Sequence, residues 1–90
     1  MTEWQTELGD DDYTVLGRII KNNLTHIIAI PKGGELSEAA WFAYTDNSYT
    51  LYGSPDINRK YDVRSELCDI KKDYNIENDW KVNDDYFNDE

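Results

Sequence analysis

Four short runs rich in β-branched and aromatic residues lie at 13–20, 24–30, 40–45 and 49–53. Each run has the length and the residue preferences of a β-strand. Clusters of Asn, Asp, Ser, Gly and Pro separate the runs, and these residue types favour turns. The connections suit antiparallel neighbours and are too short for several parallel crossovers. We therefore predict an antiparallel meander of three to four strands, in which the last two runs form a hairpin.

Two segments also permit a helical interpretation. In 11–22 the apolar residues could line one face of a helix, and the aspartates that precede them would suit its N-terminus. The β-branched residues and Gly17 disfavour a helix there, so we prefer a strand. Residues 35–39 could begin a helical turn that runs into Trp41. The sequence leaves both alternatives open.

Residues 62–74 are the clearest helix of the sequence. Asp62 is placed to act as its N-cap, and two lysines in the last turns suit the helix dipole. Residues 80–82 are predicted to add a short terminal strand. The predicted fold is therefore one α+β domain over residues 1–90, with this helix packed on one face of the meander. The apolar stripe of the helix consists of Val63, Leu67, Ile70 and Tyr74.

The net charge of the chain is −10, from 19 acids and 9 bases. Residues 1–12 contain five acids and no base, and residues 73–90 contain seven acids and one base. The central block, 13–72, contains seven acids and eight bases, so the excess lies in the two terminal segments. Such a chain repels nucleic acid and anionic membranes and attracts basic surfaces. We expect a protein partner with a basic, nucleic-acid-binding surface, without direct binding to nucleic acid or to a membrane.

The terminal segments allow two interpretations. They could be solvated tails that keep the protein soluble. They could instead form a binding surface, because apolar and aromatic side chains lie among the acids of 73–90 and could anchor a partner. The candidate partner-binding residues are Asp10, Asp11, Asp12, Asp73, Glu77, Asp79, Trp80, Asp84, Asp85, Tyr86, Asp89 and Glu90.

No catalytic motif is recognisable. The chain has one histidine, His26, and one cysteine, Cys68. Nucleophilic catalysis needs a nucleophile, a base and an orienting group close together, and neither residue lies in such a motif. We expect His26 to be a polar residue of a strand and Cys68 to be a structural thiol beside the core. We therefore predict a protein that is not an enzyme.

The sequence also lacks the patterns of common cofactor sites. One Cys and one His are too few for zinc, and the aspartate clusters do not have the spacing of a calcium loop. The segment 32–34 lacks the spacing of a phosphate-binding loop. We expect no cofactor and no metal. Because no secretory signal and no membrane span are recognisable, we expect a cytoplasmic location, in a cell or a host cell.

In charge and size the chain is similar to the small acidic phage-encoded proteins that block host defence, including anti-restriction and anti-CRISPR inhibitors. This similarity implies an inhibitor that imitates nucleic acid, since carboxylates at a spacing comparable to that of phosphates can occupy a basic channel. The alternative is a docking module for a cognate partner, such as a toxin immunity protein or an adaptor. In that case the aromatic side chains would carry the affinity and the acids the association rate.

Overall fold

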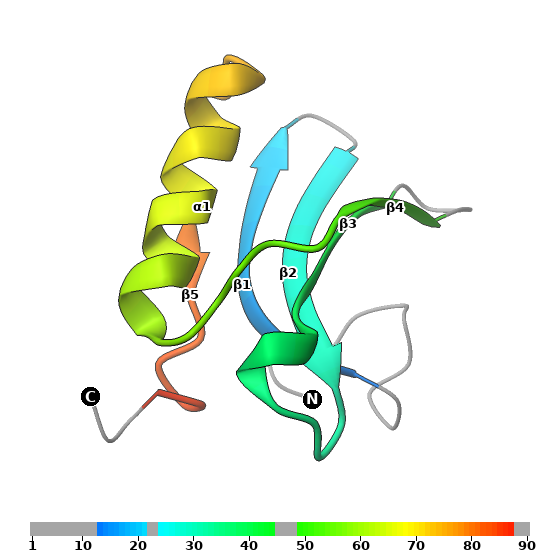
Figure 1. Ribbon diagram of the computed structural model, residues 1–90. Coiled ribbons are helices and arrows are strands. Elements are labelled where there is room, and N and C mark those ends of the chain that lie inside the picture. Colours follow the sequence, from blue (N-terminus) through cyan, green and yellow to red (C-terminus); the bar gives the residue numbers. More distant parts are fainter. Residues whose placement is uncertain (1–12, 22–23, 45–48, 88–90) are drawn as a thin grey trace.

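A computed structural model describes residues 13–21, 24–44 and 49–87 and shows an α+β fold (Figure 1). Within these residues, five antiparallel strands form one sheet in the order β4-β3-β2-β1-β5. The predicted meander is confirmed in β1 to β4, and the predicted terminal strand joins the sheet beside β1. The strands are β1 (Tyr13–Lys21), β2 (Leu24–Pro31), β3 (Ala40–Tyr44), β4 (Tyr49–Gly53) and β5 (Lys81–Val82).

Both open alternatives are decided by strand pairing. The segment predicted as strand or helix is β1, which pairs with β2 along its whole length. The helical turn after β2 exists as a short 3-10 helix, η1 (Leu36–Glu38), but it ends before Trp41, which lies in β3. Of the turn predicted at 21–23, Lys21 is the last residue of β1, and the other two residues lie outside the described part of the chain, as does the turn predicted at 46–48.

The helix α1 (Lys60–Asp73) confirms the predicted helix, with two corrections at its ends. Arg59 is the N-cap, and Asp62 lies one turn further in. The Asp62 carboxylate accepts the backbone N–H groups of Asn58 at 2.9 Å and Arg59 at 3.2 Å, so it still satisfies donors at the helix start. Tyr74 is not in the core: it is the C-cap, and its side chain is exposed.

The C-terminus of α1 turns the chain sharply back along the helix. Asn75 adopts the left-handed conformation, with φ at 56°. The Ile76 N–H donates to the Lys71 carbonyl at 3.0 Å, and the Asn75 N–H donates to the Lys72 carbonyl at 3.3 Å. This is the Schellman arrangement, and it buries Ile76 in the core. Residues 76–87 consequently run back beside α1.

The core lies between α1 and one face of the sheet (Figure 1). A bulge in β1 shifts the register between Val15 and Gly17. A Cβ atom on Gly17 would lie 2.7 Å from Leu67 Cδ1 and 3.0 Å from Val63 Cγ1, so glycine permits the close approach of the helix. The buried core residues on this side include Leu16, Ile19, Ile28, Ile30, Ile57, Val63, Leu67, Ile70, Ile76, Val82 and Phe87.

A smaller apolar cluster covers the opposite face of the sheet. The rings of Tyr13 on β1 and Phe42 on β3 meet edge to face, with centroids 5.6 Å apart. Buried beside these rings are Val15, Ile27 and Ala29. In the described part of the chain, α1 is too short and too polar to cross a membrane.

The contact at Gly17 can be tested by a double-mutant cycle. Gly17→Ala should destabilise the fold by about 1–3 kcal/mol, because the added methyl group overlaps Leu67. Leu67→Ala should cost about 2–4 kcal/mol, since this side chain is fully buried. The double variant should lose less than the two costs together, because shortening Leu67 makes room for the new methyl group. Denaturant unfolding measures all three, and additive costs would show that the helix does not pack there.

Candidate protein-binding surface

Most charged residues of α1 lie on two separate faces of the helix, while Lys72, an exposed residue of the last turn, lies on neither. One helical turn takes 3.6 residues, so residues four and seven positions apart share a face. The core-facing residues are Val63, Leu67 and Ile70. On one side of them lies the basic stripe, which we define as Lys60, Arg64 and Lys71. On the other side lies the acidic stripe, which we define as Asp62, Glu66, Asp69 and Asp73.

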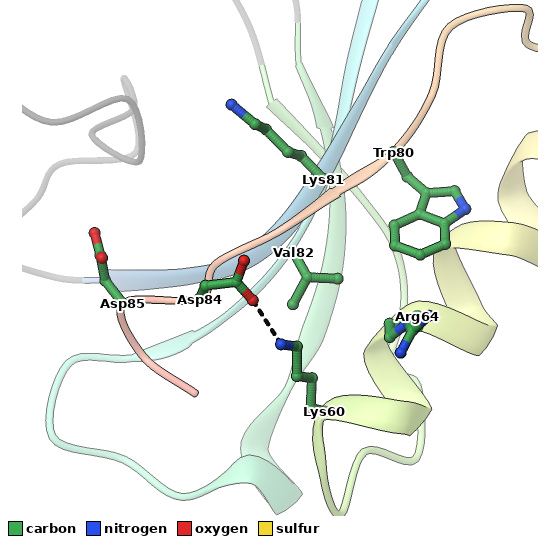
Figure 2. A pocket seen from close by; sticks show the side chains of 7 residues that line it. All are labelled: Lys60, Arg64, Trp80, Lys81, Val82, Asp84 and Asp85. Atoms are coloured by element: carbon green, nitrogen blue, oxygen red, sulfur yellow. Dashed lines mark ion pairs between the residues drawn. The ribbon is translucent and has the colours of Figure 1, made fainter. Parts of the chain in front are cut away.

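The basic stripe faces the returning C-terminal segment. Lys60 forms an ion pair with Asp84, drawn as a dashed line in Figure 2, and its Nζ atom lies 2.6 Å from Asp84 Oδ1. Near the other end of the helix, Lys71 Nζ lies 2.7 Å from Asp79 Oδ1. These carboxylates are largely exposed, and each such ion pair contributes only about 0–1 kcal/mol. The pairs therefore orient the segment, while its buried apolar residues hold it in place.

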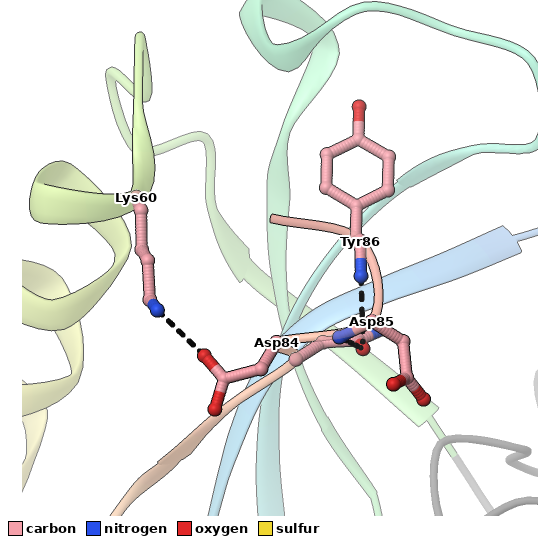
Figure 3. Close-up of polar contacts among 5 residues, drawn as sticks. Lys60, Asp84, Asp85 and Tyr86 are labelled. Carbon is pink, nitrogen blue, oxygen red and sulfur yellow. Dashed lines mark hydrogen bonds and ion pairs between the residues drawn. The ribbon is translucent and has the colours of Figure 1, made fainter. Parts of the chain in front are cut away.

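Asn83 fixes the end of the C-terminal segment to the sheet. Its side-chain amide donates to the Val15 carbonyl at 2.7 Å, and its backbone N–H donates to the Leu16 carbonyl at 2.8 Å. Its Oδ1 atom accepts the backbone N–H groups of Asp85 at 3.1 Å and Tyr86 at 3.3 Å. Figure 3 shows Asp84, Asp85 and Tyr86 on this turn, with Lys60 of α1 reaching Asp84. Asn83 is buried, so these bonds are shielded from water. It therefore positions three of the candidate residues, namely Asp84, Asp85 and Tyr86.

Trp80 lies between two open hollows on this side of the molecule. The first has a volume of about 340 Å³ and is lined by Lys60, Arg64, Trp80, Lys81, Val82, Asp84 and Asp85 (Figure 2). The second has a volume of about 420 Å³ and is lined by Arg18, Ile19, Ile20, Asn78, Asp79, Trp80 and Lys81. The Arg64 guanidinium lies 5.7 Å from the Trp80 ring centroid. A half-buried Trp beside an Arg is typical of the residues that carry binding energy at interfaces.

The structure brings together part of the predicted surface. Asp79, Trp80, Asp84 and Asp85 surround the two hollows. Tyr86 is 39% exposed, and its ring packs against Phe87 with centroids 4.9 Å apart. Two predicted acids lie elsewhere: Asp73 belongs to the acidic stripe, and Glu77 follows the helix with its side chain exposed. The predicted residues Asp10, Asp11, Asp12, Asp89 and Glu90 lie outside the described part of the chain.

The packing of residues 76–87 bears on the two interpretations of the C-terminal end. Ile76, Val82 and Phe87 are buried against α1 and the sheet. This part of the chain is therefore not a solvated tail. Its acids are displayed from an ordered backbone, although Asp79 and Asp84 are paired with lysines of α1.

The acidic stripe was missed in the sequence because charge was counted by segment. Acids and bases nearly cancel in 13–72, and the count gives no sign of their separation on the helix. The positions of the four acids, at i, i+4, i+7 and i+11, would have shown it. Glu66 is half-buried, and Asp69 and Asp73 are exposed. Within the described residues, neither Asp69 nor Asp73 forms an ion pair.

The pKa values of two carboxyl groups, Glu66 on the acidic stripe and Asp79 opposite the basic stripe, are shifted in opposite directions. Burial raises the pKa of Glu66 above its ordinary value, and the charges of Asp69 and Asp62 raise it further. The hydrogen bond from Lys71 lowers the pKa of Asp79, and the charge of Lys71 acts in the same direction. The ionised form is therefore disfavoured at Glu66, mainly by burial, and favoured at Asp79.

His26 is packed among aromatic side chains, and Cys68 lies half-buried on α1. His26 is fully buried, and its Nδ1 atom accepts the indole N–H of Trp41 at 3.1 Å. The rings of Tyr52 and Tyr74 lie 5.7 Å and 5.2 Å from the His26 ring. Cys68 is half-buried and is not in a disulfide. Within the described residues, no three His, Cys, Asp or Glu side chains are grouped so as to hold a metal ion.

No protein-family model, no characterised protein and no solved structure matches this chain. Two features distinguish the described surface, namely the acidic stripe and Trp80 with its two hollows.

Asn83→Ala should loosen the C-terminal segment and cost about 1–3 kcal/mol, because it removes buried hydrogen bonds to Val15 and to the next turn. Asn78→Ala is the matched control: Asn78 donates to the Ile20 carbonyl at 2.7 Å, but this bond is exposed. The control should cost less than about 1 kcal/mol. Denaturant unfolding gives the costs, and amide hydrogen exchange over residues 81–87 localises them. Equal effects of the two variants would contradict the role assigned to Asn83.

Glu66→Gln should stabilise the protein at neutral pH. The pKa of Glu66 is raised in the folded state, so its ionised form lowers stability as the pH rises above the ordinary value. Removing the charge relieves the cost of its partial burial, which is the larger cause, and like-charge contacts of about 0.2–0.5 kcal/mol each. Below the ordinary pKa the side chain is protonated in both states, and the gain should vanish. Unfolding at pH 7 and about pH 3 tests this, with Glu77→Gln as the exposed control. A gain that persists in acid would exclude an electrostatic cause.

Proposed function

We propose that this protein is a non-enzymatic inhibitor that occupies the basic, nucleic-acid-binding surface of a protein partner by presenting carboxylates in place of phosphates. This is the mode of action expected of the small acidic counter-defence proteins of phages, of the anti-restriction or anti-CRISPR type. The observation that carries the proposal is the acidic stripe of α1, which separates acids from bases on one rigid element.

The spacing of the acidic stripe supports imitation of a phosphate backbone. Eleven residues separate Asp62 from Asp73, and a helix rises 1.5 Å per residue, so four carboxylates span about 16 Å. The mean separation of about 5.5 Å is of the same order as the ~3.4 Å rise per phosphate along one DNA strand. The overall charge of −10 would add long-range attraction toward a basic channel.

The positions of the bases support the same proposal. Lys60 and Lys71 point toward the C-terminal segment, where they meet Asp84 and Asp79. Their charges are therefore on the far side of the helix from the acidic stripe. A partner approaching the stripe meets its carboxylates directly, with one lysine of the same helix, the exposed Lys72 of the last turn, at the edge of the stripe.

The docking-module alternative is supported by a different observation. Trp80 stands between two hollows with the Arg64 guanidinium at its ring. A partner side chain could enter either hollow and pack on the indole, so affinity would depend on apolar burial. The acids would then serve mainly to accelerate association.

Binding kinetics separate the two proposals. A pulldown from a bacterial lysate with graded salt elution supplies the partner. With that partner, the double variant Asp69→Asn/Asp73→Asn should lower the association rate about 3- to 10-fold at low salt and flatten the salt dependence. The matched control is Glu35→Gln/Asp56→Asn, which makes the same change in net charge at exposed acids away from the stripe. It should have a clearly smaller effect.

Displacement of a bound DNA duplex from the partner provides the second readout. The wild type should displace the duplex, and the stripe variant should do so poorly. Trp80→Ala should leave the salt slope unchanged. If Trp80→Ala raises the dissociation rate while both acid variants behave as the wild type, the docking module is correct and mimicry is wrong.

A further inference from the structure

The β3–β4 hairpin is almost free of charge. Residues 39–55 contain a single charged residue, Asp46, although charged residues make up 31% of the chain. Within the described sheet, β4 is the last strand in the order, so one of its sides faces away from β3. Four of its five residues are exposed. This edge of the sheet is thus uncharged, in a chain of which 31% of the residues are charged.

Exposed strand edges are usually protected against pairing by Lys, Pro or inward-pointing charges. Residues 49–52, Tyr-Thr-Leu-Tyr, contain none of these. Leu51 is 60% exposed and lies on the same face of the sheet as Phe42, its partner on β3. All four residues are compatible with a strand, and three of them, the two tyrosines and the threonine, are of types enriched in strands. Only the register shift at the Phe42/Trp41 step interrupts the regular edge.

We propose that β4 pairs antiparallel with β4 of a second copy of this chain and so joins two sheets into one. An uncharged edge offers nothing to a basic partner, whose complement is the acidic surface on α1. Two copies related by a two-fold axis present the same uncharged strand to each other, which makes the edge complementary to itself.

The placement of α1 keeps the acidic stripes of the two copies apart in this pairing. The helix α1 packs on β1 and β5, at the opposite end of the sheet from β4. In the joined sheet β1 and its symmetry mate are seven strand spacings apart, or about 34 Å at ~4.8 Å per spacing. This is about four Debye lengths at physiological salt, so the two acidic stripes barely repel each other.

The contact is short and the dimer correspondingly weak. A five-residue edge interrupted by a bulge falls short of the ~800 Å² per partner of a standard interface. We therefore expect a dissociation constant of about 10–500 µM. Because the remaining repulsion is electrostatic, added salt should tighten the dimer, which is the opposite of its expected effect on a charge-driven complex.

Sedimentation equilibrium of the purified full chain tests this proposal, over about 10 µM to 1 mM at low and at high salt. The wild type should shift from monomer to dimer with concentration, and more readily at high salt. Leu51→Lys should raise the dissociation constant at least about tenfold, because an edge lysine prevents pairing. The substitution also lowers the net negative charge, so loss of the dimer could not be attributed to added repulsion.

Tyr61→Lys is the matched control, since Tyr61 is a 64% exposed side chain on α1 and the substitution makes the same change in charge. It should dimerise as the wild type does, and the thermal unfolding of both variants shows whether they fold. A wild type that remains monomeric throughout, or equal loss in both variants, overturns the proposal. A monomer that binds another protein through an edge blocked by Leu51→Lys also overturns it and assigns β4 to a partner strand.

Discussion

The helix can lie close to the sheet because position 17 carries no side chain. At this point three elements meet: a Cβ atom on Gly17 would contact Leu67 and Val63 of α1 and would lie 3.1 Å from the backbone oxygen of Lys81 in β5. The contact fixes the rotation of α1 about its own axis, because Val63 and Leu67 must face Gly17. Once that rotation is set, the basic stripe turns toward the C-terminal segment and the acidic stripe toward solvent. The arrangement of charge on the surface thus depends on packing in the core.

The helix separates charges that the sequence places side by side. Acids and bases are interspersed along the sequence of α1. Because each residue advances about 100° around the helix axis, most residues of like charge nevertheless lie on a common face. On one face the lysines meet carboxylates of the returning chain, and the pKa of Asp79 falls. On the other face, burial and the neighbouring charges of Asp69 and Asp62 raise the pKa of Glu66, so the charge of Glu66 is carried at a cost in stability.

The strands and the helix could be predicted because their signals are local. β1 and β2 follow from runs of β-branched residues, and α1 follows from apolar spacing over four turns. Tyr74 was misplaced because the left-handed residue after it ends the helix, which spacing alone does not show. Asn83 could not be found, since its side chain bonds to Val15, a residue 68 positions away, and no local pattern encodes that contact. The acidic stripe could have been predicted from the sequence, but only by comparing the spacing of the acids with the helical repeat of 3.6 residues. Counting charges by segment does not show it.

The two edges of the described sheet differ in a way that links the fold to its uses. At the β5 edge the paired strand has two residues, and the neighbouring surface carries Lys81, Asp79 and Asp84. Such an edge resists further pairing through its shortness and its charges. At the β4 edge the strand is longer and uncharged, so the same protection is missing. A chain that places charge on nearly every other part of its surface could have placed a lysine there at little cost, because the exposed side chain of Leu51 contributes little to the core. The absence of charge from β4 and the separation of acids from most bases on α1 therefore place an uncharged edge and a charged helix at opposite ends of the described sheet.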